Sequence, residues 1–211
     1  VTDLEYAKVI QAIQAFEYRI CSSLDLQNRF QAPPIEVVSE QCDTIKFDDE
    51  DVPRALYFLK DKYPEKYLLF KESIFTLFPE FIDFDVQTYE PKKGDIHLYA
   101  TNVEGITEME HGEIPFHVRD EMYRLVIQSS TLNQPINISM MSTGTKRLFW
   151  LLANVFISSC TNVSCIGIEE LETSIHPKMM KNLLEILSEA LEDTQLIISS
   201  HSPYLIQYLK N

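Results

Sequence analysis

The strongest constraint on the fold is an alternation of short apolar runs and helical periods that begins near residue 137. The pattern predicts strands over 136–140, 163–168 and 195–199, and helices over 143–157, 177–190 and 203–209. Short apolar strands that alternate with helices are typical of a parallel sheet that is buried on both faces. We therefore predict an α/β fold with helices flanking a parallel sheet, and a ligand site at the carboxyl ends of its strands.

The chain before residue 137 has a different texture, and we expect three regions in all. Residues 1–80 form a helical region, residues 81–136 a mixed β region with antiparallel strands, and residues 137–211 the α/β core. In the helical region an amphipathic helix is expected over 64–78. A first helix is predicted from apolar residues at steps of three and four, which are Leu4, Ala7, Ile10, Ile13, Phe16 and Ile20. The isolated His97, His111 and His117 of the β region are interpreted as surface or packing residues.

Composition excludes some classes of function. The 211 residues are 45% hydrophobic, which is enough for a buried core without disulfides. The 18 basic and 32 acidic residues give a net charge of −14, and no basic cluster supports binding to a nucleic-acid backbone. Contact with nucleic acid stays open only through a local patch or through parts outside this sequence. The four cysteines form no metal-ligand pattern and point to a cytoplasmic protein. No apolar run reaches the roughly 20 residues of a membrane span.

Three polar segments follow or precede the predicted strands of the α/β core. The first is the run from Ser142 to Lys146 at a helix start, where Ser142 is a natural cap and Gly144 allows close approach to the backbone. Free backbone amides and the helix dipole favour an anion at such a position. A capped helix start with no ligand is the plain alternative.

The other two segments come at strand ends. Glu169 and Glu170 follow the strand over 163–168, where one carboxylate can hold Mg²⁺ and the next can polarise an attacking water. The alternative is a strand that ends in solvent. His201 follows the strand over 195–199 and can donate a hydrogen bond to a terminal phosphate or to that water. A purely structural histidine is the alternative there.

Taken together and in this order, the three segments resemble the ABC-class P-loop ATPases. The similarity is greatest to the branch of structural-maintenance-of-chromosomes (SMC) proteins, overcoming-lysogenization-defect (OLD) nucleases and related AAA-type ATPases of bacterial defence systems. The run from Met141 to Arg147 resembles the ABC signature. The run from Ile168 to Pro177 resembles Walker B and the D-loop, and the run from Ile198 to Pro203 resembles the switch-histidine segment.

The resemblance implies a role for each matching residue. Glu170 would orient the attacking water, Glu169 would hold Mg²⁺, and His201 would sense the γ-phosphate of ATP. Nucleotide and dimer contacts would come from a further set, which is Ser142, Thr143, Gly144, Thr145, Lys146, Ser174 and His176. Of these, Ser142 and Gly144 would meet the ATP of a second ATPase head, and the segment from Ser174 to His176 would lie at the dimer interface. Closure of a head-to-head dimer on ATP would then gate an effector, such as a nuclease or another protein, in antiviral defence or DNA maintenance.

Two positions depart from the family pattern. Glu169 stands where the family usually has Asp, which places normal Mg²⁺ geometry in question. The sequence also contains no Gly-x-x-x-x-Gly-Lys-Ser/Thr phosphate loop. We therefore expect the chain to be the carboxyl-terminal part of an ATPase domain, which hydrolyses ATP only when an amino-terminal Walker A lobe and a second copy are supplied. Alone, it is expected to bind ATP poorly.

Two other functions remain open at this stage. One is a scaffold or regulatory module in which an ATPase fold has lost turnover and binds a partner protein. The other is a metal-dependent nuclease that uses Glu169, Glu170 and Glu172. A nuclease would need further acidic residues at separate strand ends, and in the OLD proteins that chemistry belongs to a later domain.

Overall fold

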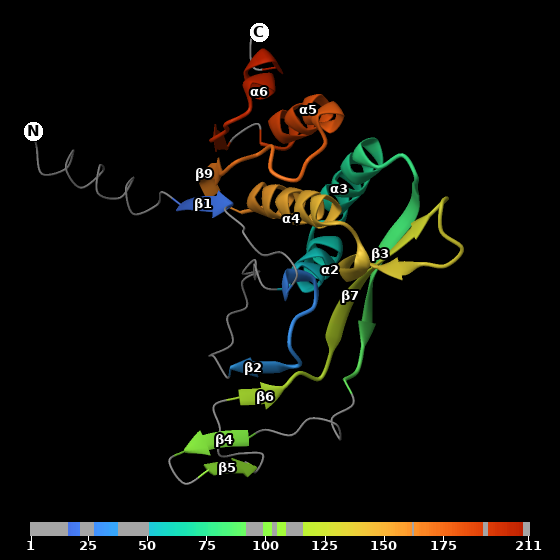
Figure 1. Ribbon diagram of the computed structural model, residues 1–211, viewed down its shortest axis with the longest axis vertical. Helices are drawn as coiled ribbons and strands as arrows, with labels where there is room; N and C mark the ends of the chain where they lie inside the picture. The colour runs from blue at the N-terminus through green and yellow to red at the C-terminus, as the bar shows by residue number, and fades with distance from the viewer. Residues whose placement is uncertain are drawn as a thin grey trace, which may run out of the picture.

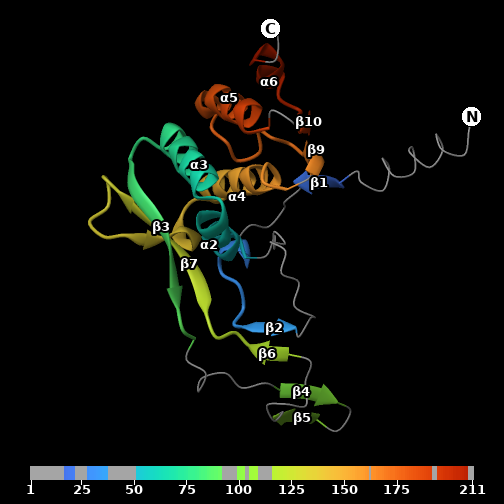
Figure 2. The ribbon, with the colours of Figure 1, turned by 180° about the vertical axis from the view of Figure 1, so that it is seen from behind.

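The computed structural model describes residues 17–21, 28–37, 51–91, 99–102, 105–108, 116–161, 163–191 and 194–208. Several sequence-based expectations fall outside these ranges, including the helical pattern before residue 17, His97 and His111. Within them, the molecule has an upper α/β body and a set of small antiparallel strand pairs at the opposite end (Figures 1 and 2).

Among the described residues, the parallel sheet of the body has three strands, in the order β1 (Glu17–Cys21), β9 (Val163–Ile168) and β10 (Gln195–Ile198). Both outer strands run parallel to β9. The prediction of a helix that continues to Ile20 is wrong at that residue, because Ile20 lies in β1 and pairs with a strand far along the chain. Pairing with a distant segment overrides the local helical period.

One face of this sheet is incompletely covered. Ile20, Gly167 and Ile197 stand in register across the three strands. Both isoleucine side chains are 56% exposed. The expectation that the strand over 195–199 is buried is therefore wrong for the described part of the chain, because the side that carries Ile197 lacks a covering layer there.

The described part of the α/β core has the helices α4 (Thr143–Ser158), α5 (Met180–Ala190) and α6 (Pro203–Tyr208). The short 3-10 helix η4 (Pro177–Met179) leads into α5. From Thr145 to Ser158 every residue of α4 is buried, because α4 packs between α2, α3 and α5. The predicted α/β class, with a parallel sheet and flanking helices, is confirmed (Figure 1). No described helix is long and apolar enough to cross a membrane.

Helices α2 (Val52–Lys62) and α3 (Pro64–Leu77) both pack against α4. The predicted helix over 64–78 is confirmed as α3. Asp51 caps α2, and its Oδ1 accepts a hydrogen bond from the Arg54 backbone N–H at 3.2 Å. The other carboxylate oxygen of Asp51 bonds the Arg119 guanidinium at 2.5 Å in a buried pair. This pair fastens the start of α2 to the end of a β segment 68 residues away.

Two long antiparallel strands complete the central packing. They are β3 (Phe81–Tyr89) and β7 (Met122–Ser129), and the short β8 (Ile136–Asn137) pairs with β7. The predicted parallel strand over 136–140 is therefore wrong. Only its first two residues are strand, they run antiparallel, and Ile138–Met140 form the 3-10 helix η3. The Asn137 side chain accepts the Ser139 backbone N–H at 2.9 Å, which turns the chain out of the strand.

Smaller elements lie away from the parallel sheet (Figures 1 and 2). Strand β2 (Ile35–Val37) pairs with β6 (Phe116–Val118), and β4 (Tyr99–Asn102) pairs with β5 (Gly105–Glu108), both antiparallel. His117 lies in β6. The 3-10 helix η1 (Asn28–Phe30) contacts α2.

The core is dominated by aromatic rings from α3, β3 and α4. Phe84 and Phe149 meet edge to face with ring centroids 5.2 Å apart. Phe70 and Phe156 make a similar contact at 5.8 Å. Edge-to-face pairs align the positive edge of one ring with the negative face of the other. Because α4 contributes both Phe149 and Phe156, these contacts fix its position in the body.

Candidate functional site

The carboxyl ends of β9 and β10 meet at one edge of the parallel sheet. Glu169 and Glu170 follow β9 directly, and Ser199 is the first residue after β10. The Glu170 backbone N–H donates to Ser199 Oγ at 3.1 Å, and the Ser199 N–H donates to the Ile168 carbonyl at 2.9 Å. The segment that carries Glu169 and Glu170 and the segment that carries His201 therefore lie side by side.

Glu172 joins these segments through its carboxylate. Its Oε1 accepts the His201 backbone N–H at 2.7 Å, and its Oε2 accepts the Ser200 hydroxyl at 2.7 Å. Partial burial acts to raise the pKa of Glu172, but the hydrogen bonds from Ser200 and from the backbone of His201 and Ser202 outweigh it, so the pKa lies below its ordinary value. The sequence suggests Glu172 only as one of three carboxylates of a metal-dependent nuclease. The structure shows that it orders the turn that carries His201.

The loop after β9 has an unusual backbone. Glu170 has a φ of 46° and Ser174 a φ of 62°, which places both in the left-handed region. For residues other than glycine this region costs roughly 1–3 kcal/mol, and it persists only where surrounding contacts enforce it. The Thr173 hydroxyl donates to Glu170 Oε2 at 3.0 Å, and the Thr173 N–H donates to the Glu170 carbonyl at 2.9 Å. The loop is therefore closed around Glu170.

The first turn of α4 lies against the same loop. Ser142 caps the helix as predicted, because its Oγ accepts the Thr145 N–H at 3.1 Å. A Cβ on Gly144 would stand 2.2 Å from the Ser174 carbonyl oxygen, a distance that real Cβ atoms do not reach. Glycine is thus required at position 144 for the helix start and the loop to touch.

The remaining predicted residues are placed as follows. Thr143 is exposed, whereas Thr145 and Lys146 are buried in the first turns of α4. His176 is exposed and caps η4, since its Nδ1 accepts the Lys178 N–H at 3.2 Å. The segment that carries Ser174 and His176 therefore borders the helix start.

Arg147 was part of the signature-like run but received no role from the sequence. It is 4% exposed, and its Nη2 donates to the backbone carbonyls of Glu169 and Glu170 at 2.9 Å each. The available signal was a basic residue at the head of the apolar run from Leu148 to Ala153. A charge inside a buried helix needs a polar partner, and that partner is the loop after β9.

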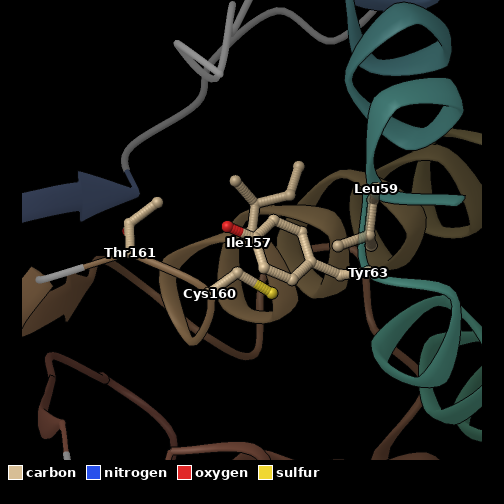
Figure 3. A pocket seen from close by; sticks show the side chains of 5 residues that line it. All are labelled: Leu59, Tyr63, Ile157, Cys160 and Thr161. Atoms are coloured by element: carbon tan, nitrogen blue, oxygen red, sulfur yellow. The ribbon is translucent and has the colours of Figure 1, made fainter. Parts of the chain in front are cut away.

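The site is an open edge rather than a closed pocket. Glu169, Glu170 and His201 are all exposed. Two cavities among the described residues lie elsewhere. A small apolar cavity is lined by Leu59, Tyr63, Ile157, Cys160 and Thr161, where the α2–α3 junction meets the end of α4 (Figure 3). A shallow groove runs between α3 and α5. In the described part of the chain, no three His, Cys, Asp or Glu residues are grouped to hold a metal ion.

Comparison with known families decides the class. A family model described as "AAA domain, putative AbiEii toxin, Type IV TA system" matches residues 24–207. The chain belongs to this family. The comparison with curated proteins found no match to this chain.

One of the similar solved structures supports the same fold, and two further matches are weaker. An SMC head bound to the C-winged helix domain of ScpA is similar with a TM-score of 0.50 and 12% identity, over 90% of this chain and 49% of that one. A Pyrococcus furiosus SMC head with an extended coiled coil, bound to the C-terminal domain of ScpA, has a TM-score of 0.46 and 13% identity. The match covers 72% of this chain and 32% of that one. A structure from work on ATP-driven dimerisation and DNA-stimulated activation of SMC ATPases has a TM-score of 0.45 and 10% identity. The match covers 72% of this chain and 77% of that one. The chain spans about half the length of the first of these heads, whose likeness shows that the AAA domain has an SMC-head type of ATPase fold.

Proposed function

We propose that this AAA domain is the catalytic-carboxylate part of an ABC-type ATPase that hydrolyses ATP at a head-to-head dimer interface. One observation carries the proposal. The residues that follow the neighbouring parallel strands β9 and β10 include Glu170 and His201, and the two segments are joined by the bond from the Glu170 N–H to Ser199 Oγ. Ligands of open parallel sheets bind outside the carboxyl ends of the strands, which is where these side chains emerge.

In this proposal each exposed polar side chain has a separate role in ATP hydrolysis. The Glu170 carboxylate orients the attacking water and accepts its proton, and His201 donates a hydrogen bond to the terminal phosphate. Glu169 is the residue that would hold Mg²⁺. Its single exposed carboxylate fits that ion, because Mg²⁺ takes one or two carboxylates and completes its shell with phosphate oxygens and water. When bound, Mg²⁺ neutralises charge that develops on the phosphates.

A second copy supplies the other half of each site. The first turn of α4, with Ser142, Thr143 and Gly144, presents backbone amides and a hydroxyl to ATP held by the partner head, aided by the positive end of the helix dipole. Thr145 and Lys146 support that turn from within the body. Ser174 and His176 border the interface. The contact between Gly144 and the Ser174 carbonyl supports this arrangement, because it places both segments on one surface.

The proposal also requires a phosphate-binding loop, which the 211 residues lack. An amino-terminal Walker A lobe would supply it and grip the β- and γ-phosphates of ATP. Dimer closure would then gate an effector, such as a nuclease or another partner protein, in the manner of the OLD-like branch, in antiviral defence or DNA maintenance.

The test is phosphate release by the AAA domain completed with a Walker A lobe. Glu170→Gln keeps the size of the side chain but removes its basicity, so kcat should fall about 10²- to 10⁴-fold while ATP binding and ATP-driven dimerisation remain. Glu185→Gln is the control, because Glu185 is an exposed carboxylate on α5 that forms an ion pair with Lys181 at 3.6 Å. Unchanged release by Glu170→Gln would rule out the assigned base. ATP binding without release by the unmodified protein would favour a scaffold or regulatory module instead.

A further inference from the structure

One buried guanidinium connects helix α4 to the loop that holds the proposed catalytic carboxylate. Arg147 lies in the second turn of α4, and Nη2 alone bonds two successive carbonyls, those of Glu169 and Glu170. Burial lowers the pKa of Arg147, and the charges of Glu170 and Glu172 act to raise it. Bonds from an ionised donor are stronger than neutral ones, particularly away from water.

The geometry of these two bonds specifies a backbone conformation. The Glu169 and Glu170 carbonyls belong to the peptide units on either side of the Glu170 Cα atom. Successive carbonyls point to the same side in helical conformations, and to opposite sides in an extended strand. A single donor atom can reach both only in the first case. Glu170 takes the left-handed form of it, with a φ of 46°.

The other side of the same residue is held by the end of β10. The Glu170 N–H donates to Ser199 Oγ at 3.1 Å, and the Leu171 N–H donates to the Ser199 carbonyl at 3.3 Å. Both peptide units that flank Glu170 are therefore fixed, from α4 through their carbonyls and from β10 through their N–H groups. An unfavourable conformation at a non-glycine residue needs this kind of two-sided support.

We propose that Arg147 is a positioning residue, which holds Glu170 in its left-handed conformation so that the carboxylate faces the nucleotide edge. This inference rests on the proposed function. It adds a link between the two composite sites of a dimer, because the helix that meets the ATP of the partner copy also sets the backbone of Glu170. A small rotation of α4 on dimer closure would move the Arg147 guanidinium together with the Glu169 and Glu170 carbonyls that it bonds, and with them the Glu170 carboxylate.

The experiment compares Arg147→Gln and Arg147→Lys in the ATPase completed with its Walker A lobe. Arg147→Gln should lower kcat about 10- to 100-fold, because small misplacements of a catalytic group have effects of that size. The KM for ATP and the dissociation constant of the ATP-driven dimer should each change by less than about threefold, because in the proposal Arg147 contacts neither ATP nor the partner head. Arg147→Lys should recover part of kcat, because an ammonium can still donate to both carbonyls.

Arg119→Gln is the matched control for the loss of a buried guanidinium. Arg119 is 9% exposed and pairs with Asp51 at the start of α2, and neither residue belongs to the parallel sheet. Its loss should lower the melting temperature and leave kcat per folded molecule unchanged, whereas Arg147→Gln lowers kcat per folded molecule. If Arg147→Gln does not fold, Arg147→Lys carries the test, with kcat at least about threefold below wild type at unchanged KM.

Wild-type kcat in the folded Arg147→Gln protein would overturn the inference, as would a purely thermal defect like that of Arg119→Gln. Where only Arg147→Lys folds, wild-type kcat in that variant would overturn it. The Glu170→Gln result separates the two levels. If Glu170→Gln releases phosphate normally, the proposed function fails first. If Glu170→Gln is inactive and Arg147→Gln is fully active, only the positioning role fails.

Discussion

The aromatic core and the polar edge of the parallel sheet are built in opposite ways, although helix α4 belongs to both. In the core, Phe149 touches Phe70, Phe78, Phe81 and Phe84, with ring centroids between 5.2 and 6.4 Å apart. At the edge, a few hydrogen bonds hold exposed acidic residues and two left-handed residues. The core is held by many non-directional ring contacts, whereas the edge depends on a few directional hydrogen bonds.

This difference shows how the fold can hold an unfavourable loop. Burial of aromatic surface stabilises the body by non-directional contacts that depend on area. That stability offsets the roughly 1–3 kcal/mol that each left-handed residue costs. Because α4 is fixed in the core at Phe149 and Phe156, its first turns present Gly144 and Arg147 to the loop in a defined position. A precise site therefore depends on a rigid element.

The largest effect should come from the core. Phe149→Ala removes a fully buried ring on α4, and it should lower the free energy of unfolding by about 3–5 kcal/mol. Denaturant unfolding measures this loss, with Leu68→Ala as the control because Leu68 is 57% exposed on α3. A loss below about 1 kcal/mol for Phe149→Ala would contradict the assignment of this cluster as the main core.

A smaller loss of stability with a larger functional effect is expected at the edge. In Gly144→Ala the new methyl group overlaps the Ser174 carbonyl oxygen, so the loop and the helix start must separate. Overpacking of this kind costs about 1–3 kcal/mol. Phosphate release by the completed ATPase should fall more steeply than stability, because both Ser174 and the presented helix turn are displaced. Equal activity of wild type and Gly144→Ala would show that the contact has no functional weight.

The smallest effect concerns pH. The folded pKa of Glu172 is lowered, so its ionised carboxylate stabilises the fold above the unfolded pKa, and that contribution is lost as pH falls through the folded value. Glu172→Gln should cost on the order of 1 kcal/mol at neutral pH. The gap between wild type and variant should close on acidification, as measured by urea unfolding at several pH values. A gap that widens toward acid pH would reverse the assigned sign.

The sequence predicted the elements whose signal is local. The strand over 163–168 and the helices that begin at residues 143 and 203 match the structure closely, because apolar periodicity and a Ser142 cap mark them. It also placed Glu170 and His201 at one edge, since neighbouring parallel strands end together. The roles assigned to these residues remain predictions.

Features that depend on distant contacts could not be predicted in this way. Ile20 extends a helical period, yet β1 forms because β9 accepts it as a neighbour. The left-handed backbone of Glu170 and Ser174 carries no sequence mark, since neither is glycine or asparagine. The bonds from Glu172 to the turn at His201, and from Arg147 to two carbonyls, arise only after the chain has folded.

The row of Ile20, Gly167 and Ile197, which the other described residues leave exposed, has a practical consequence for handling this polypeptide. Apolar side chains exposed together tend to associate between molecules. A net charge of −14 opposes that association by mutual repulsion at neutral pH. Low ionic strength and neutral buffers therefore favour dispersed material, while acidification or concentrated salt weakens the repulsion and leaves the isoleucine face to drive precipitation.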